Sequence, residues 1–340
     1  MEGGEAKIIH SVPSADYSVQ AFAELKNAIY VHLRQDVTQC MVSWDTHDTD
    51  IKEKYEKVSQ NLAVVGLECL RMVEPTVAAA LYGTVALNLD KPDPVSLCTI
   101  IADEKSFQTA YLSVDDGFVL VQGVDAVNAP NGTTLSEEQI AHCSKKTLKH
   151  INQKFNKNFW GSDDLKKVLV VGDLFDNFAQ VIGCTQSEIL QIEEENVAKG
   201  VAINAAILSG DMSVKDIILI DAIYSAIGVE IDDGTVETVL PCGTSIPTWK
   251  KLDFTVANAN QQEAMFNIVV SSDDFESDRK SVGVLTLSSL GNMQPDETKI
   301  ELRVDIDANK IIFVTAKDLA SGKEVFQKFK SVGNFMFPID

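Results

Sequence analysis

Hydrophobic residues along the chain follow two spacings, and the change between them comes near residue 212. Before that point, segments with apolar residues three and four positions apart alternate with short unbroken apolar runs. The first spacing predicts amphipathic helices, and the second predicts buried strands. The expected helices cover residues 17–35, 50–67, 135–155 and 193–211, and the expected strands include 39–44 and 166–176. This alternation predicts an α/β domain.

A different pattern lies inside this region, in residues 98–124. Three short apolar runs are separated by the polar turns 103–106 (Asp-Glu-Lys-Ser) and 115–117 (Asp-Asp-Gly). Runs of β-branched and aromatic residues bounded by Asp, Ser and Gly predict a β-meander. The first turn is heavily charged, which is unexpected for a loop that serves only to connect two strands.

Beyond residue 212 the chain reads as short strands of alternating polarity, with no long helical spacing. Segments such as 226–231, 252–257, 300–306 and 310–318 predict an antiparallel β-sandwich of about a hundred residues. An apolar tetrad separates the two patterns and consists of Ile217, Ile218, Leu219 and Ile220. The expected organisation is therefore an α/β domain at 1–211, an interdomain linker at 212–222 and a β-domain at 223–335.

Composition and charge exclude several classes of function. The chain has 340 residues, of which 45% are hydrophobic and 23% charged, with a formal net charge of −21. Such an acidic surface repels phosphate backbones, so direct binding to nucleic acid is not expected. No apolar run approaches the roughly 18 residues that span a bilayer. The first ten residues lack the features of a secretory signal, so the expected location is the cytosol, with no membrane partner.

The motifs of common catalytic and metal sites are missing from the sequence. The six cysteines are scattered without a C-x-x-C pair, which argues against a disulfide framework or a zinc site and fits a reducing compartment. His47 lies between Asp45 and Asp48, where a solvated loop is the expected structure. The sequence carries no P-loop, G-x-G-x-x-G, H-E-x-x-H or G-x-S-x-G motif. No catalytic residue and no metal site are therefore expected.

Five segments, taken in order, resemble the 70-kDa heat-shock protein family. The segment 67–83 is similar to the family's strand, Glu-Pro-Thr turn and Ala-rich helix, and 195–211 is similar to the last helix of its nucleotide-binding domain. Residues 214–221 resemble its interdomain linker, and 243–261 resemble part of its β-sandwich. The most specific similarity is 304–324, which contains Asp-Ile-Asp-Ala-Asn, a Val-x-Ala-x-Asp strand and Ser-Gly-Lys-Glu.

The resemblance implies a partial nucleotide-binding domain of the actin-like ATPase type, followed by a peptide-binding β-sandwich without a helical lid. In the family, glycines occupy the phosphate-binding turn because backbone N–H groups must close on the phosphate. The turn 103–106 stands in their place, and residues 173–176 replace an adenosine-binding motif. Gly172 and Gly200 are the remaining candidates for a degenerate nucleotide site. The expectation is therefore no cofactor and no ATP hydrolysis by this chain alone, with ATP and Mg²⁺ bound only if the family's activity is retained.

The same resemblance places a peptide-binding cleft in the β-domain. It implies Val229 and Ala264 at the floor, with Ala257 and Asp232 on the two sides of an arch. Family members hold extended apolar peptides by strand-like backbone hydrogen bonds and one apolar pocket. The linker tetrad 217–220 would dock the β-domain on the α/β part.

The missing lid and the altered turn resemble the family's atypical, ribosome-associated branch. This similarity implies a non-catalytic chaperone or co-chaperone that binds unfolded or nascent polypeptide, a J-domain partner and, through that partner, the ribosome. Two alternatives stay open at this point. One is a working ATP-dependent chaperone, and the other is a truncated product without function.

Overall fold

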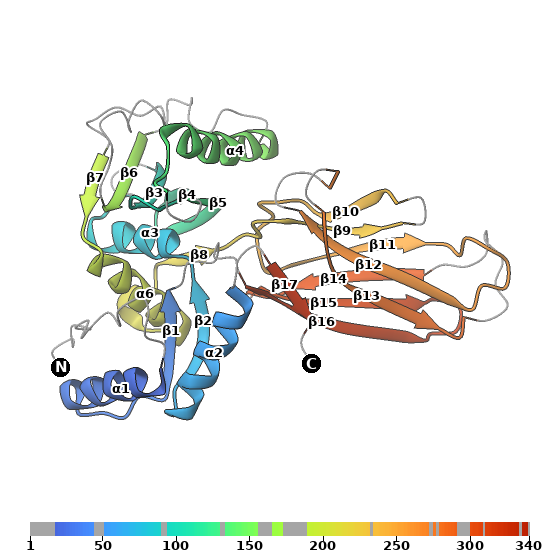
Figure 1. The fold of residues 1–340 in the computed structure, drawn as a ribbon, viewed down its shortest axis with the longest axis horizontal. Helices are drawn as coiled ribbons and strands as arrows, with labels where there is room; N and C mark the ends of the chain where they lie inside the picture. Colours follow the sequence, from blue (N-terminus) through green and yellow to red (C-terminus); the bar gives the residue numbers. More distant parts are fainter. Residues whose placement is uncertain are drawn as a thin grey trace. The chain divides into compact units, whose positions relative to one another are not determined.

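The computed structural model divides the chain into two compact units, unit 1 (Met1–Ile220) and unit 2 (Asp221–Asp340), which are coloured along the sequence in Figure 1. Each unit is described by itself. The residues that the structure describes are 18–43, 51–89, 94–129, 133–155, 165–172, 189–231, 234–271, 275–276, 279–290, 300–308, 310–332 and 335–338.

Unit 1 contains helices and strands in alternation, as the hydrophobic spacing predicts. Its helices are α1 (Val19–Leu33), α2 (Ile51–Val64), α3 (Pro75–Ala86), α4 (Glu137–Phe155), α6 (Glu195–Ser209) and the short 3₁₀ helix η2 (Met212–Val214). Its strands are β1 (Gln39–Ser43), β2 (Glu68–Val73), β3 (Val95–Ala102), β4 (Ser106–Asp115), β5 (Phe118–Asn128), β6 (Leu165–Gly172), β7 (Ile189–Ile192) and β8 (Ile218–Ile220).

Six of these strands form a mixed sheet in the order β7-β6-β3-β4-β5-β8. Its centre is the antiparallel meander β3-β4-β5, so the meander predicted from 98–124 is confirmed. On the other side of β3, the strands β6 and β7 pair in parallel, as expected for the continuous apolar run in β6. The short strand β8 pairs in parallel with β5 and closes the far edge.

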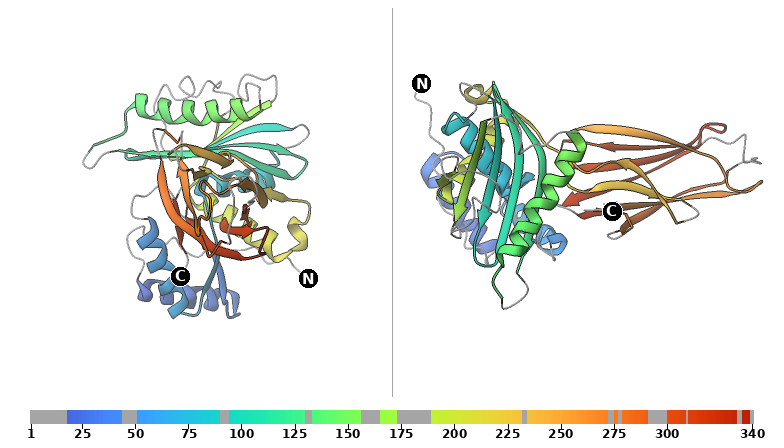
Figure 2. Two further views of the ribbon diagram at one scale, coloured as in Figure 1. Left: turned by 90° about the vertical axis from the view of Figure 1, so that its right-hand side faces the viewer. Right: turned by 90° about the horizontal axis from the view of Figure 1, so that it is seen from above.

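Helices lie on both faces of this sheet, with α3 on one side and α4 on the other (Figure 2), and α6 packs against α3. Successive side chains of β3 point to opposite faces of the sheet, so this strand contacts the helices on both sides. Cys98 and Ile100 pack with Ile140 of α4, while the Thr99 hydroxyl faces α3 and donates to the Thr76 carbonyl at 2.8 Å. Both faces of the central strands are therefore buried.

The strands β1 and β2 form a separate parallel pair, and no further strand of the described chain joins them. Helix α6 packs against β1, α2 packs against β2, and α1 packs against α2. Helix α1 begins at Ser18, whose hydroxyl accepts a hydrogen bond from the Ala21 amide at 3.1 Å, an N-cap that satisfies one free N–H of the first turn.

Unit 2 consists of two antiparallel sheets in its described part. The sheets are β10-β9-β12-β13 and β11-β14-β15-β16-β17. The strands are β9 (Ala226–Glu230), β10 (Val236–Leu240), β11 (Thr248–Phe254), β12 (Glu263–Ser271), β13 (Lys280–Ser288), β14 (Ile300–Ile306), β15 (Ile311–Asp318), β16 (Glu324–Val332) and β17 (Phe335–Pro338).

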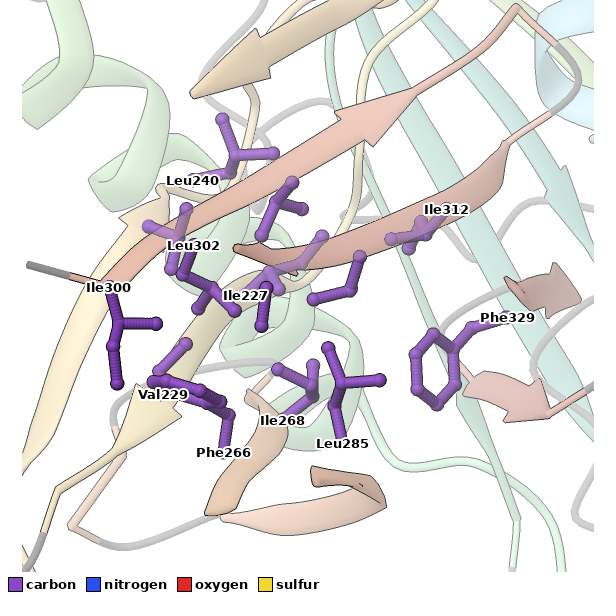
Figure 3. Close-up of a cluster of buried hydrophobic side chains, with 14 of the residues drawn as sticks. Ile227, Val229, Leu240, Phe266, Ile268, Leu285, Ile300, Leu302, Ile312 and Phe329 are labelled. Atoms are coloured by element: carbon purple, nitrogen blue, oxygen red, sulfur yellow. The ribbon is translucent and has the colours of Figure 1, made fainter. Parts of the chain in front are cut away.

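The two sheets of unit 2 share one hydrophobic core, part of which is drawn in Figure 3. Strand β14 shows how a sheet directs one face into this core. Its even-numbered residues from Ile300 to Ile306 are buried, and the residues between them are partly exposed. Fully buried side chains from both sheets, such as Ile268 and Leu302, belong to the same cluster. Each fully buried side chain of this size contributes about 1.5–3 kcal/mol, so this core is the main source of stability in unit 2.

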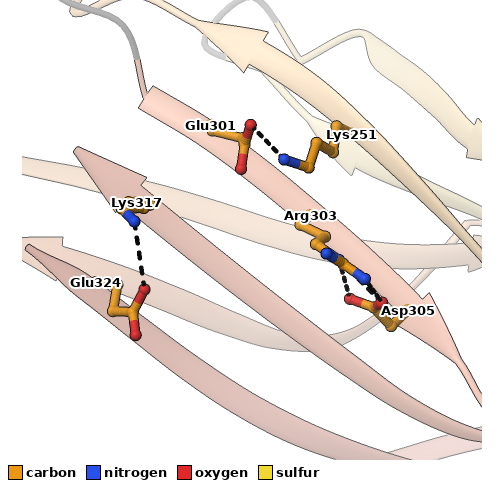
Figure 4. A network of polar contacts seen from close by, with 6 residues as sticks. All are labelled: Lys251, Glu301, Arg303, Asp305, Lys317 and Glu324. Atoms are coloured by element: carbon orange, nitrogen blue, oxygen red, sulfur yellow. Dashed lines mark hydrogen bonds and ion pairs between the residues drawn. The ribbon is translucent and has the colours of Figure 1, made fainter. Parts of the chain in front are cut away.

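Charged side chains occupy the outer face of the five-stranded sheet (Figure 4). Ion pairs join Lys251 to Glu301, Arg303 to Asp305 and Lys317 to Glu324. Water screens exposed and partly exposed pairs of this kind, so they add little to the stability of the fold.

Several details differ from the sequence-based expectation. Strand β11 begins at Thr248 and ends at Phe254, earlier than the run 252–257 suggests, because the whole of this segment pairs with β14. The strands β7, β8, β16 and β17 were not expected. Within the described part of the chain, no helix combines the length and the apolar composition that crossing a membrane requires.

Candidate functional site

The charged turn between β3 and β4 binds its own backbone amides. The Asp103 carboxylate accepts hydrogen bonds from the amides of Lys105 at 2.6 Å and Ser106 at 2.7 Å. The Asp103 amide in turn donates to the Ser106 carbonyl at 2.9 Å. The carbonyl groups of Glu104 and Lys105 accept from the amides of Leu135 and Ala129. The turn is therefore closed on itself by a carboxylate.

This arrangement has a direct chemical consequence. The N–H groups that a phosphate-binding turn directs at an anion are here already bound to an anion, the Asp103 carboxylate. A phosphate would have to displace that carboxylate and would then lie beside Asp103 and Glu104, whose charges repel it. The turn connects β3 to β4, and its hydrogen bonds leave no pair of free amides for a ligand.

The two candidate glycines occupy different places. Gly172 ends β6 beside Ala102, its partner in the parallel ladder, so it lies next to the turn 103–106. Its φ is +94°, and a Cβ there would lie 2.0 Å from the Ala102 carbonyl oxygen. Gly200 lies in α6, where a Cβ would lie 1.8 Å from the Ala78 carbonyl oxygen of α3. Close backbone approach explains both glycines without a ligand.

The candidate peptide site in unit 2 lies at one end of the four-stranded sheet. Ala264 is near the start of β12 and is 8% exposed, whereas Val229 in β9 is fully buried. Val229 pairs with Ile268, so Val229 and Ala264 share the inward face but are separated along the strand. Between them on the same face lies Phe266, which contacts Phe254 edge-to-face with ring centroids 5.3 Å apart.

Two loops leave the sheets at this end. Strand β9 ends at Glu230 opposite Asn267, in the middle of β12, and runs antiparallel to β12 toward the start of that strand. The loop 255–262 joins β11 to β12 at the same place and carries the exposed Ala257. Asp232, the expected partner of Ala257 across the arch, lies outside the described residues.

Gln261 fixes the loop that carries Ala257. Its side-chain oxygen accepts hydrogen bonds from the amides of Ala257 at 3.0 Å and Asn258 at 3.3 Å, and its side-chain nitrogen donates to the Glu263 carbonyl at 2.6 Å. The sequence analysis did not single out Gln261 or Phe266. Phe266 lies two positions after Ala264 in β12, so the two side chains share one face, and this spacing is the signal that could have found Phe266.

Most of the linker tetrad forms a short strand of unit 1. Ile217 follows η2, and Ile218, Leu219 and Ile220 form β8, whose ladder partners are Phe118, Val119 and Leu120 of β5. The Ile218 amide donates to the Gly117 carbonyl at 2.9 Å. This segment, expected as an extended linker, therefore forms an edge strand.

The remaining candidates give no further site. His47 and residues 173–176 lie outside the described residues. Among the residues that are described, no group of three or more His, Cys, Asp or Glu side chains is close enough to hold a metal ion.

Comparison with known proteins agrees on one family. The family model described as "Hsp70 protein" matches residues 137–334. The chain is also similar to "Chaperone protein DnaK" of Deinococcus deserti and of Deinococcus radiodurans, with 31% identity over 194 residues in each case. These matches cover 55% of this chain and 31% of each relative, so the chain spans about a third of their length. The mixed sheet of unit 1 is compatible with an actin-like ATPase fold.

Proposed function

Since the chain belongs to the Hsp70 family, we propose that it acts as a chaperone or co-chaperone that binds unfolded or nascent polypeptide and does not hydrolyse ATP on its own. Unit 2 is then the family's β-sandwich peptide-binding domain, which receives an extended apolar segment at the end where β12 begins.

The observation that carries the peptide-binding role is the combination of an apolar floor and a fixed loop at this end. Ala264 and Phe266 are apolar side chains on the inward face of β12, exposed to 8% and 5%. The loop that carries Ala257 is held by three hydrogen bonds of Gln261, so its shape is set before a ligand arrives. A fixed loop reduces the entropy that binding costs. Val229 lies deeper and would line only the base of the pocket.

The closed turn at Asp103 supports the absence of independent ATP hydrolysis. Its amides are bound to a carboxylate, and the place of the γ-phosphate is flanked by negative charge. A chain that does not cycle with ATP would act by holding polypeptide or by assisting another chaperone. A J-domain partner, and through it the ribosome, is the assembly we propose on the likeness to the atypical branch of the family.

Peptide binding is tested with a fluorescent, extended apolar peptide and two variants of neighbouring residues. Ala264→Leu fills the inward face of β12, and we expect it to weaken binding at least about tenfold, since a filled pocket excludes the peptide side chain. The matched control is Met265→Leu, because Met265 is 71% exposed on the opposite face of the same strand. Equal affinities for the two variants, or no binding by the unchanged chain, would contradict the proposal.

Nucleotide binding is tested separately by thermal unfolding of the full chain with and without Mg-ATP. A ligand at 100 times its dissociation constant adds about 2.7 kcal/mol, which is a clear shift of the transition. We expect no shift. A transition that moves with ATP would favour the ATP-dependent chaperone instead, and an unfolding curve without any cooperative transition would favour the truncated, non-functional product.

A further inference from the structure

Two cysteines that are far apart in the sequence face each other in unit 1. Cys40 in β1 and Cys69 in β2 are direct partners in the parallel ladder, and Figure 1 shows the two strands side by side. Neighbouring strands lie about 4.8 Å apart, and disulfides join Cα atoms about 4.4–6.8 Å apart. Paired residues also direct their side chains to the same face of the sheet. The backbone spacing of this pair therefore suits a disulfide.

The two thiols influence each other's ionisation. Both are reduced and half-buried, and the Cys69 thiol donates to the Arg71 carbonyl oxygen at 3.7 Å. The neighbouring Cys69 thiol raises the pKa of Cys40, and burial raises it further. The neighbouring Cys40 thiol lowers the pKa of Cys69, helped by the backbone of Arg71 and opposed by burial. Cys69 is therefore the thiol that ionises first and the better nucleophile.

The local backbone can adjust to a covalent bond. The ladder has an irregularity between Cys40 and Met41, where the register shifts by a residue. The sheet has only two strands in the described chain, and α6 and α2 pack against them. The register shift lies beside Cys40, so β1 is already irregular at the residue that would move.

We propose that Cys40 and Cys69 form a dithiol modification site that reacts with a low-molecular-weight disulfide, such as oxidised glutathione, to give a reversible intramolecular disulfide. Of the other described cysteines, Cys98 of β3 and Cys143 of α4 are buried in the core of unit 1, and Cys242 lies in unit 2. Cys184 lies outside the described residues.

The reaction balances with glutathione disulfide as the oxidant. The Cys69 thiolate attacks one sulfur of the disulfide, which forms a mixed disulfide and releases one glutathione thiolate. Cys40 then loses its proton and attacks the Cys69 sulfur, which releases the second glutathione thiolate. Two protein thiols are oxidised by two electrons, and one glutathione disulfide is reduced to two glutathione molecules.

The product would stabilise the two-stranded sheet of unit 1. The bond closes a loop that contains all of α2, and cross-linking such a loop lowers the entropy of the unfolded chain. The stability of β1 and β2 would then depend on the ratio of oxidised to reduced low-molecular-weight thiols around the protein.

The test treats the full chain with oxidised glutathione, blocks the remaining thiols with an alkylating reagent and maps cross-linked peptides by mass spectrometry. We expect one intramolecular cross-link between Cys40 and Cys69, reversed by dithiothreitol, and a melting temperature of unit 1 raised by several degrees. Cross-links between chains, glutathione adducts without the cross-link, or no reaction at this pair would each overturn the proposal.

Variants test the assigned roles of the two sulfurs. In Cys40→Ser a hydroxyl donor stands beside Cys69, whereas Cys40→Ala removes the donor. We expect a stable glutathione adduct on Cys69 in both, formed several-fold faster in Cys40→Ser, and slower reaction of Cys40 in Cys69→Ser. Cys242→Ser is the control that leaves the cross-link unchanged. Equal rates for the two Cys40 variants would overturn the role of Cys40 as donor, and the mapping of the unchanged chain does not depend on how the variants fold.

Discussion

Single residues decide the structure where two backbones approach closely or where a carboxylate closes a turn. Gly200 belongs to the first kind, because α6 crosses α3 with no room for a Cβ at that point. Asp103 and Asp318 belong to the second, since each accepts hydrogen bonds from the amides of the turn that follows it. In all three positions the resemblance to a family pointed to a special residue, and the contacts explain what that residue does.

Gly200→Ala is expected to destabilise unit 1 by about 3 kcal/mol, because the helices must separate to admit the methyl group. Gly210→Ala is the matched control. Gly210 has a φ of +71°, but no atom lies within 4 Å of the position that a Cβ would take. The free energy of unfolding of that variant should therefore fall by only about 1 kcal/mol, the cost of the left-handed conformation for alanine. Urea unfolding followed by circular dichroism measures both values. Equal losses would show that the contact between the helices relaxes freely.

Asp318 explains the most specific motif of the sequence. It is fully buried, accepts from the amides of Ala320 and Ser321, and is also hydrogen-bonded by the Ser321 hydroxyl. Asp318→Ala leaves these donors without their acceptor and should cost unit 2 about 1–3 kcal/mol. Asp318→Asn keeps one acceptor oxygen and should recover part of the loss. A free energy of unfolding that is the same for both variants would contradict this role of the carboxylate.

At the scale of elements, the linker segment is held to unit 1 as the strand β8. Its position depends on the turn between β4 and β5, where Gly117 has a φ of +86° and accepts a hydrogen bond from the Ile218 amide. A Cβ on Gly117 would lie 2.1 Å from the Asp216 carbonyl oxygen. The tight turn at 115–117 is therefore also the docking point of β8.

Gly117→Ala should release β8 from the edge of the sheet while the meander stays folded. We expect the amides of Ile218 and Leu219 to exchange with deuterium several-fold faster and the segment 212–220 to become sensitive to protease. Gly322→Ala serves as the control, because Gly322 also has a positive φ of +75° but lies in open space in unit 2. Unchanged exchange at Ile218 in the Gly117 variant would contradict the dependence of β8 on this turn.

At the scale of the whole molecule, each unit has its own core. The core of unit 2 is built from both of its sheets and draws on residues from Ile223 to Phe329. The core of unit 1 includes the face beneath α4. An independent core of this extent is what allows a segment to fold by itself.

Residues 221–340 expressed alone are therefore expected to unfold in one cooperative transition. Thermal unfolding measured by differential scanning calorimetry checks this, with agreement of calorimetric and van't Hoff enthalpies as the criterion. A broad, non-cooperative transition of the isolated segment would mean that unit 2 depends on unit 1.

The strong negative charge of the chain also predicts that added salt raises the melting temperature of the full chain by screening self-repulsion.

Local sequence patterns were sufficient for most elements. The helical spacing of 17–35, 135–155 and 193–211 and the meander at 98–124 appear in the structure as α1, α4, α6 and β3-β4-β5. The short strands β7 and β8 were missed because three or four residues carry too little periodicity to separate a strand from a loop. The candidate peptide site was reached only through the resemblance to a family, and Phe266 and Gln261 became visible only in the structure.

The sequence by itself determined most of the helices and strands, because these depend on neighbours along the chain. Only the tertiary structure decided which distant residues meet. In the structure the turn amides donate to Asp103, Gly200 lies against Ala78, and Cys40 pairs with Cys69. Such contacts depend on strand order and register, which follow from the burial of whole faces and cannot be read from local spacing.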